Sequence, residues 1–331
     1  LLDILARRVS SGAMRNYCAL SADLLLGKIG GSITLNGVVS GALGADLTKV
    51  GVGTLVLNGV NDYAGLTNIN AGIVIAGNAA ALGTTGGGTT VANLASLQIA
   101  NGINVNAEPL NINGAGVVGS SPGALTQALN GSSSFAGPIT VQTASTISTN
   151  GVGTLTLTGG IDKTNVVLTL NGGGTITINT AGISGNNDNA FNDDLIVDAA
   201  TTVNLNVANT YEGPTFIRNG STVNANVANA LPTVNGRTRI EMDAGVGNLA
   251  LGASQSIASV TSVAGQASTI NLGANTLTIG FGSGQNTNGT ANANFAGVIS
   301  GTGSIIKDDT STQIFSGNNR SEERRVGKEC L

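Results

Sequence analysis

The sequence contains no histidine and no tryptophan, and its 331 residues include only 5 prolines. Without histidine, a Ser-His-Asp catalytic triad cannot form. Aromatic residues make up 3% of the chain and charged residues 10%, against about a quarter charged in an ordinary globular domain. This composition, rich in Gly, Asn and Thr, argues against a bulky globular core. Disorder is excluded too, because it needs low hydrophobicity and high net charge, and 41% of this chain is hydrophobic.

The chain has two cysteines, Cys18 and Cys330, and both lie near the ends. A disulfide scaffold is therefore excluded, and the middle of the chain has neither the cysteines nor the histidines that bind zinc. No apolar stretch reaches the 18 residues that a membrane-spanning helix needs. We expect no cofactor.

Charge is distributed unevenly and divides the chain into three parts. Residues 1–33 and 320–331 hold 8 of the 14 Lys and Arg and 5 of the 18 Asp and Glu. Residues 34–319 therefore hold 6 basic and 13 acidic residues, a net charge of −7. This body lacks the basic patch that neutralises phosphates, so we expect no nucleic-acid partner.

The two ends differ in character from the body. Leu1 is not a methionine and residues 1–33 lack the order of a signal peptide, so we expect the natural start to be missing. Apolar spacing predicts a short amphipathic helix over Leu1–Val9 and a second over Ala19–Leu26, either as a native cap or as an out-of-frame read. Residues 320–331 (RSEERRVGKECL) resemble the translation of a common sequencing adapter. A native charged tail is the alternative.

The body between residues 34 and 319 contains internal repeats, which indicate a repetitive fold. Gly51-Val-Gly-Thr-Leu-Val-Leu57 recurs as Gly151-Val-Gly-Thr-Leu-Thr-Leu157. The pattern Asn-x-Tyr-x-Gly-x-Thr occurs at residues 61–67 and again at 209–215. Residues 37–59 are echoed by residues 297–317, where Lys307 matches Lys49. The positions that we single out as structural are Gly51, Gly53, Leu55, Leu57, Gly59, Asn61, Tyr63, Gly65, Thr67, Gly151, Gly153, Leu155, Leu157, Asn209, Tyr211, Gly213, Thr215, Gly297, Ser300 and Gly301.

Short segments of period two, each closed by Asn-Gly or Gly-x-Gly, predict strands that stack as a parallel β-solenoid. In Thr154–Thr158 the leucines fall on one face and the threonines on the other. Glycine suits the sharp corners, and Thr and Asn suit ladders between coils. At roughly 22 residues per coil the body makes about 13 coils, a rod about 60 Å long. Asn-Gly pairs also suit antiparallel hairpins, which is the structural alternative.

The segments 51–83, 209–231, 254–280 and 295–307 resemble the passenger-associated transport repeat of autotransporter proteins. The resemblance covers most of residues 34–319, although residues 101–150 and 160–200 match poorly and are expected to carry irregular coils or loops. It implies a right-handed parallel β-helix, secreted by the type V route and displayed on, or released from, the outer surface of a Gram-negative bacterium. It also implies a C-terminal outer-membrane β-barrel as partner, which this sequence does not contain.

Few residues suggest chemistry. Asp188, Asp193 and Asp194 offer oxygen ligands for calcium but lack the spacing of an EF-hand, so a solvated loop is the preferred interpretation. Asp162-Lys163 and Asp308-Asp309 are expected to be surface charge. Arg237 and Arg239 are expected on one face of a strand with Glu241, in cross-strand pairing. Thr-x-Thr pairs at 154/156, 175/177 and 276/278 are a feature of ice-binding or crystal-binding faces, but here they lie scattered along the sequence.

These observations predict a non-enzymatic, adhesin-like stalk whose partner is a ligand on a host or neighbouring cell or in the matrix. The alternatives are a polysaccharide-acting β-helix enzyme, a stalk for an upstream catalytic domain, and an ice- or crystal-binding solenoid.

Overall fold

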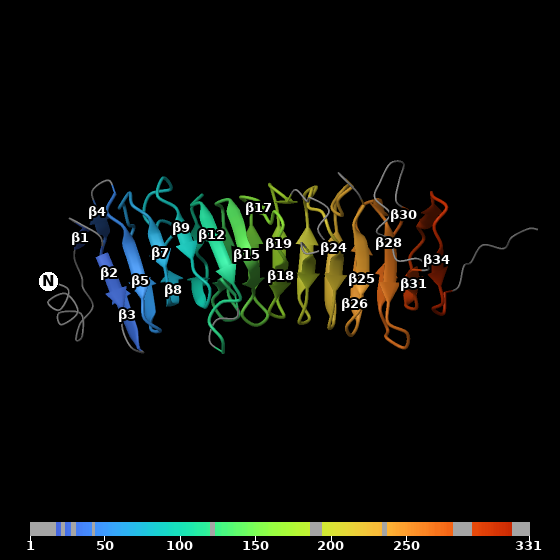
Figure 1. The fold of residues 1–331 in the computed structure, drawn as a ribbon, viewed down its shortest axis with the longest axis horizontal. Coiled ribbons are helices and arrows are strands. Elements are labelled where there is room, and N and C mark those ends of the chain that lie inside the picture. The colour runs from blue at the N-terminus through green and yellow to red at the C-terminus, as the bar shows by residue number, and fades with distance from the viewer. Residues whose placement is uncertain are drawn as a thin grey trace, which may run out of the picture.

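The protein is a parallel β-solenoid of about 12 turns, seen in a computed structural model (Figure 1). The structure describes residues 18–20, 24–27, 31–41, 44–119, 123–185, 194–233, 237–280 and 293–319. Consecutive coils lie side by side, so the colour changes steadily from one end of the rod to the other (Figure 1). At about 4.8 Å per coil, these turns give a rod about 60 Å long.

The strands of each coil fall into three columns, and every strand pairing among the described residues is parallel. Column 1 contains β2 (Leu24–Gly27), β5 (Leu47–Val50), β7 (Thr67–Ile69), β9 (Thr89–Val91), β12 (Leu110–Gly114), the start of β15 (Ile139–Ser148), β17 (Ile161–Asp162) and β20 (Ile183–Ser184). Column 2 contains β3 (Ser32–Leu35), β6 (Thr54–Leu57), β8 (Gly72–Ala76), β10 (Ala95–Ile99), β13 (Leu125–Gln127), the end of β15, β18 (Leu168–Asn171), β21 (Leu195–Val197), β23 (Thr215–Ile217), β25 (Arg239–Met242) and β28 (Ser259–Ser262).

Column 3 is a separate sheet of nine strands. Its members are β11 (Asn104–Val105), β14 (Ser132–Phe135), β16 (Thr154–Leu157), β19 (Thr175–Ile178), β22 (Thr202–Leu205), β24 (Ser221–Ala225), β26 (Gly247–Leu251), β29 (Thr269–Asn271) and β32 (Val298–Ser300). Three smaller ladders complete the ends: β1 (Cys18–Leu20) with β4 (Val39–Gly41); β27 (Gln255–Ile257) with β30 (Thr276–Ile279) and β33 (Ser304–Lys307); and β31 (Ala293–Phe295) with β34 (Gln313–Phe315).

Period-two alternation explains why these segments form strands around a narrow core. In β16, Leu155 and Leu157 are buried and Thr154 and Thr156 are half-exposed. The core is a single hydrophobic cluster, almost entirely of Leu, Ile, Val and Ala, that runs the length of the stack. Because each coil covers the inward residues of the next, a short strand gains full burial only through stacking.

The gaps between the described ranges fall between strands. Residues 120–122 fall between β12 and β13, and residues 186–193 fall between β20 and β21. Residues 234–236 fall between β24 and β25, and residues 281–292 fall between β30 and β31.

Two expectations about local structure are wrong. The helix predicted over Ala19–Leu26 is replaced by strands β1 and β2, which pair with β4 and β5 because adjoining coils offer them unpaired backbone groups. The hairpin alternative fails as well, since all described pairings are parallel. Strands β1 and β2 lie on the N-terminal side of the boundary expected at residue 33. The helix predicted over Leu1–Val9 and the adapter-like residues 320–331 lie outside the described residues.

Candidate functional site

The asparagine of the repeated Asn-x-Tyr-x-Gly-x-Thr motif bridges adjacent coils. Asn61 is buried; its Oδ1 accepts a hydrogen bond from Val39 N at 2.8 Å, and its Nδ2 donates to Ala81 O at 2.6 Å. Asn209 makes the equivalent bonds to Ile183 N and Ala230 O, each 2.7 Å long. No strand forms at this corner. The asparagine side chain therefore provides the acceptor and the donor that the backbone of a strand would otherwise offer to the coils on either side.

The tyrosine and threonine of the motif form a buried pair. Tyr63 Oη lies 2.7 Å from Thr67 Oγ1, and Tyr211 Oη lies 2.8 Å from Thr215 Oγ1. Both rings are fully buried. Burial raises the pKa of each phenol far above its usual value of 10, so both tyrosines stay neutral and hydrogen-bonded. They fill the interior and hold the corner; neither is accessible for chemistry.

Glycine is required in the motif by close approach of the backbone. A Cβ on Gly65 would lie 2.2 Å from Ala45 O, a distance that side chains do not reach. Gly51 and Gly151 have φ of 72° and 74°, and each begins a corner that exposes the following valine.

The remaining repeat positions follow the same division between corner and core. Leu55, Leu57, Leu155 and Leu157 are buried in columns 2 and 3. Gly53, Gly59, Gly153, Gly213, Gly297 and Gly301 lie at corners, and Ser300 ends β32, where its carbonyl accepts a hydrogen bond from Leu272 N. These repeat positions therefore lie either in the buried core or at the corners between strands.

The passenger-associated-transport-repeat family matches residues 47–76 and 200–224 of the chain. The chain carries passenger-associated transport repeats. No curated protein and no solved structure matches it. The two matched repeats have the same local structure: β6 pairs with β8 one coil above it, and β22 pairs with β24 in the same manner.

The two transport repeats do not occupy the same columns. In the first, β6 and β8 lie in column 2 and β7 in column 1; in the second, β22 and β24 lie in column 3 and β23 in column 2. The second repeat is thus rotated by one column around the rod axis. The motif therefore specifies a corner and its flanking strands, and it does not specify one face of the rod.

Two buried lysines lie beside the repeats. Lys49, 2% exposed, donates to the carbonyls of Val50, Gly51 and Ala71 at 2.6–3.0 Å. Burial lowers its pKa. Lys163 is fully buried, so the prediction of surface charge is wrong there: its ammonium lies 5.4 Å from the Tyr211 ring centroid and 3.2 Å from Glu212 O.

Glu108 is a carboxyl buried among neutral groups. It is 2% exposed and accepts hydrogen bonds from Thr89 Oγ1, at 3.2 Å, and from the Gly88 backbone. Burial raises its pKa from 4.5 to about 7, an effect that the two hydrogen bonds partly oppose. No described residue forms an ion pair with it. Nothing in the local sequence distinguishes this glutamate from an exposed one.

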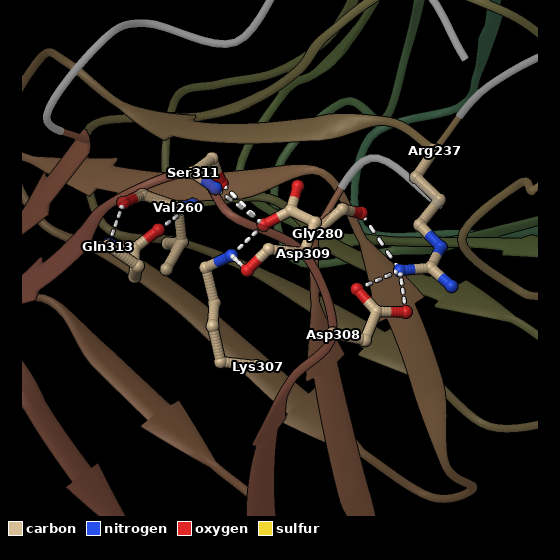
Figure 2. Close-up of polar contacts among 8 residues, drawn as sticks. All are labelled: Arg237, Val260, Gly280, Lys307, Asp308, Asp309, Ser311 and Gln313. Atoms are coloured by element: carbon tan, nitrogen blue, oxygen red, sulfur yellow. Dashed lines mark hydrogen bonds and ion pairs between the residues drawn. The ribbon is translucent and has the colours of Figure 1, made fainter. Parts of the chain in front are cut away.

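Charged side chains gather near the C-terminal coils, where Arg237, Lys307, Asp308 and Asp309 lie close together (Figure 2). Arg237 Nη1 contacts Asp308 at 2.7 Å and Gly280 O at 2.8 Å, and so joins segments 71 residues apart. Lys307 pairs with Asp309. Arg239 and Glu241 both lie on β25 and pair with each other at 2.9 Å, whereas Arg237 lies before the start of this strand.

Gln313 adds a neutral contact beside this charged cluster (Figure 2). Its amide accepts from Val260 N at 3.0 Å and donates to Val260 O at 2.9 Å, which ties β34 to β28. This contact and the Arg237–Asp308 ion pair join separate coils of the stack. In the same cluster, Ser311 Oγ donates a hydrogen bond to Asp309 Oδ1 at 2.7 Å.

Two of the three weak calcium candidates cannot be placed. Asp188 and Asp193 lie outside the described residues, and Asp194 is half-exposed immediately before β21. Within the described ranges, no three His, Cys, Asp or Glu side chains lie close enough to hold a metal ion. The same ranges include no helix that could cross a membrane.

The prediction that the Thr-x-Thr pairs are scattered is wrong for two of the three. Thr154 and Thr156 of β16 lie in register beside Thr175 and Thr177 of β19, one coil apart. The register continues into β22 and β24, where Thr202 and Thr222 follow in the same row. Only the pair at 276/278, on β30, lies in another ladder. The register could not be read from the sequence, because coil lengths vary.

Proposed function

We propose that the chain is part of an autotransporter passenger and serves as a rigid, adhesin-like stalk. The observation that carries the proposal is the continuous parallel stack containing two matched transport repeats. The family implies a protein that is secreted or displayed at the surface, and it suggests a structural stalk in preference to a catalytic domain. Buried repeat residues agree with that role, because they hold coils together and present no reactive group.

The chemistry of the body fits export as an extended chain. Residues 34–319 contain no cysteine, so no disulfide loop obstructs passage through a narrow barrel. Each coil contacts mainly its neighbours, so coils can stack one by one as they emerge. The partners of this proposal are the passenger's own outer-membrane β-barrel and a ligand on a host or neighbouring cell or in the matrix.

A display experiment tests the proposal. The full chain is fused between a signal sequence and an autotransporter barrel in a Gram-negative host, with an unrelated cysteine-free globular domain as control. We expect the chain to become sensitive to protease added outside intact cells, and the displaying cells to adhere to matrix-coated surfaces or aggregate more than control cells. Retention in the periplasm would refute display, and display without added adhesion would refute the adhesive role.

A further inference from the structure

The outer face of column 3, defined as the outward side chains of β14, β16, β19, β22, β24, β26 and β29, forms two rows of mainly polar residues. The first row contains Thr or Ser on every one of these strands except β26, which contributes Asn248. The second row begins with Ser134, Thr156 and Thr177 and continues as asparagine, apart from Ala250. Hydroxyls and amides thus repeat at about 4.8 Å along the rod.

This face carries no charge. None of the nine strands of column 3 contains Asp, Glu, Lys or Arg. The body has a net charge of −7, and its described charged residues lie on strands outside column 3 or between strands. An acidic polymer would therefore be repelled by the body and would find no cation on the face, so a neutral partner fits best.

The face also presents hydroxyl groups that the protein itself does not use. The hydroxyls of Thr154, Thr156 and Thr175 make no hydrogen bond within the described residues, and all three side chains are half-exposed. Because β-branched side chains are stiff, these hydroxyls are held in place for a partner at little entropic cost.

The asparagines of the second row favour a polysaccharide over an ice surface as the neutral partner. Asn224 Nδ2 donates to Asn204 Oδ1 at 2.7 Å, and Asn204 Nδ2 donates to Thr177 Oγ1 at 3.3 Å, which leaves Asn224 Oδ1 for a ligand. Asparagine is longer than threonine, so the second row does not form the single plane that an ice surface requires. A flexible chain of sugar hydroxyls, each both donor and acceptor, can adapt to such a row.

We propose that the outer face of column 3 binds a neutral polysaccharide lying along the rod. Individual contacts are weak, since no exposed aromatic ring lies on these strands. Repetition over successive coils supplies the affinity. The proposal rests on the adhesive role proposed above and names the chemistry of its ligand.

The test is electrophoresis of the full chain through native gels containing hydroxyethylcellulose or dextran, with polygalacturonate as the acidic comparison. The variant Thr154→Ala/Thr156→Ala/Thr175→Ala removes three hydroxyls that make no protein bond, so the fold should survive. The matched control, Thr48→Ala/Thr90→Ala/Thr140→Ala, alters outward threonines of column 1. Thermal melting followed by circular dichroism checks the fold of both.

We expect a neutral polysaccharide to retard the wild type and the column 1 variant, and the column 3 variant to bind about tenfold more weakly. Equal retardation of all three proteins, retardation by polygalacturonate alone, or no retardation would overturn the proposal. Inhibition of ice recrystallisation without retardation would also overturn it and assign the face to ordered water. Displayed cells that adhere equally with the column 3 variant would refute the ligand while leaving the adhesive stalk intact.

Discussion

Replacing Glu108 with glutamine tests how a buried carboxyl limits the stability of the solenoid. Glu108 accepts hydrogen bonds from Thr89 Oγ1 and from the Gly88 backbone and has no cationic partner among the described residues. Glutamine keeps an oxygen for both donors and places an uncharged amide where the second carboxyl oxygen lies. The substitution therefore removes the charge and preserves the contacts.

The magnitude follows from the raised pKa. In the unfolded chain Glu108 has a pKa near 4.5, and in the folded protein burial raises it to about 7. Between these values the folded protein holds a proton that unfolding releases, so the free energy of unfolding falls as pH rises through this window. At about 1.4 kcal/mol per pH unit, the free energy of unfolding falls by about 3 kcal/mol across this window, and the fall is complete above about pH 7.

The assay is urea unfolding of wild type and Glu108→Gln, followed by far-UV circular dichroism at pH 4.5 and pH 8. We expect the wild type to lose about 3 kcal/mol more than the variant between these two conditions. Glu241→Gln, which removes a half-exposed carboxylate of an ion pair, serves as the control for a change in net charge.

Hydrogen exchange locates the effect. Amides of β9 and β12, which flank Glu108, should gain protection at pH 8 in the variant, after correction for the intrinsic pH dependence of exchange. The same pH dependence in wild type and Glu108→Gln, or a variant less stable than wild type at pH 8, would refute the reasoning.

Three further predictions concern the transport repeats, each read out by urea unfolding. Gly65→Ala should lower the free energy of unfolding by about 1–3 kcal/mol, because its Cβ would meet Ala45 O at 2.2 Å. The control Gly86→Ala, which has open space around it, should leave the free energy of unfolding nearly unchanged. Equal losses in the two variants would show that the corner relaxes freely. Asn209→Ala should lower the free energy of unfolding by about 2–4 kcal/mol, because it leaves Ile183 N and Ala230 O buried without partners. A smaller loss would mean that water replaces the amide. Tyr211→Phe should cost about 1 kcal/mol, and a stabilised variant would contradict the role of its hydroxyl.

The sequence by itself determined the class of fold and the division between core and corner. Alternation in segments such as Thr154–Leu157 requires one buried face, and strands this short cannot bury it without stacking. In the motif Asn-x-Tyr-x-Gly-x-Thr, only the asparagine side chain has both the donor and the acceptor needed to replace backbone hydrogen bonds between coils. The alternation of β5 also puts Lys49 on the same inward face as Leu47, so the sequence indicates that this lysine is buried.

Only the tertiary structure decided which residues meet across coils. Coil length varies along the chain, so sequence spacing does not reveal that Thr154 lies beside Thr175, or that the second transport repeat is rotated by one column. The burial of Glu108 and Lys163 depends on which residues of the neighbouring coils cover them, and this cannot be predicted from the sequence around either residue. The N-terminal strands β1 and β2 make the same point: an apolar spacing that suits a helix becomes a strand once an adjacent coil offers unpaired backbone groups.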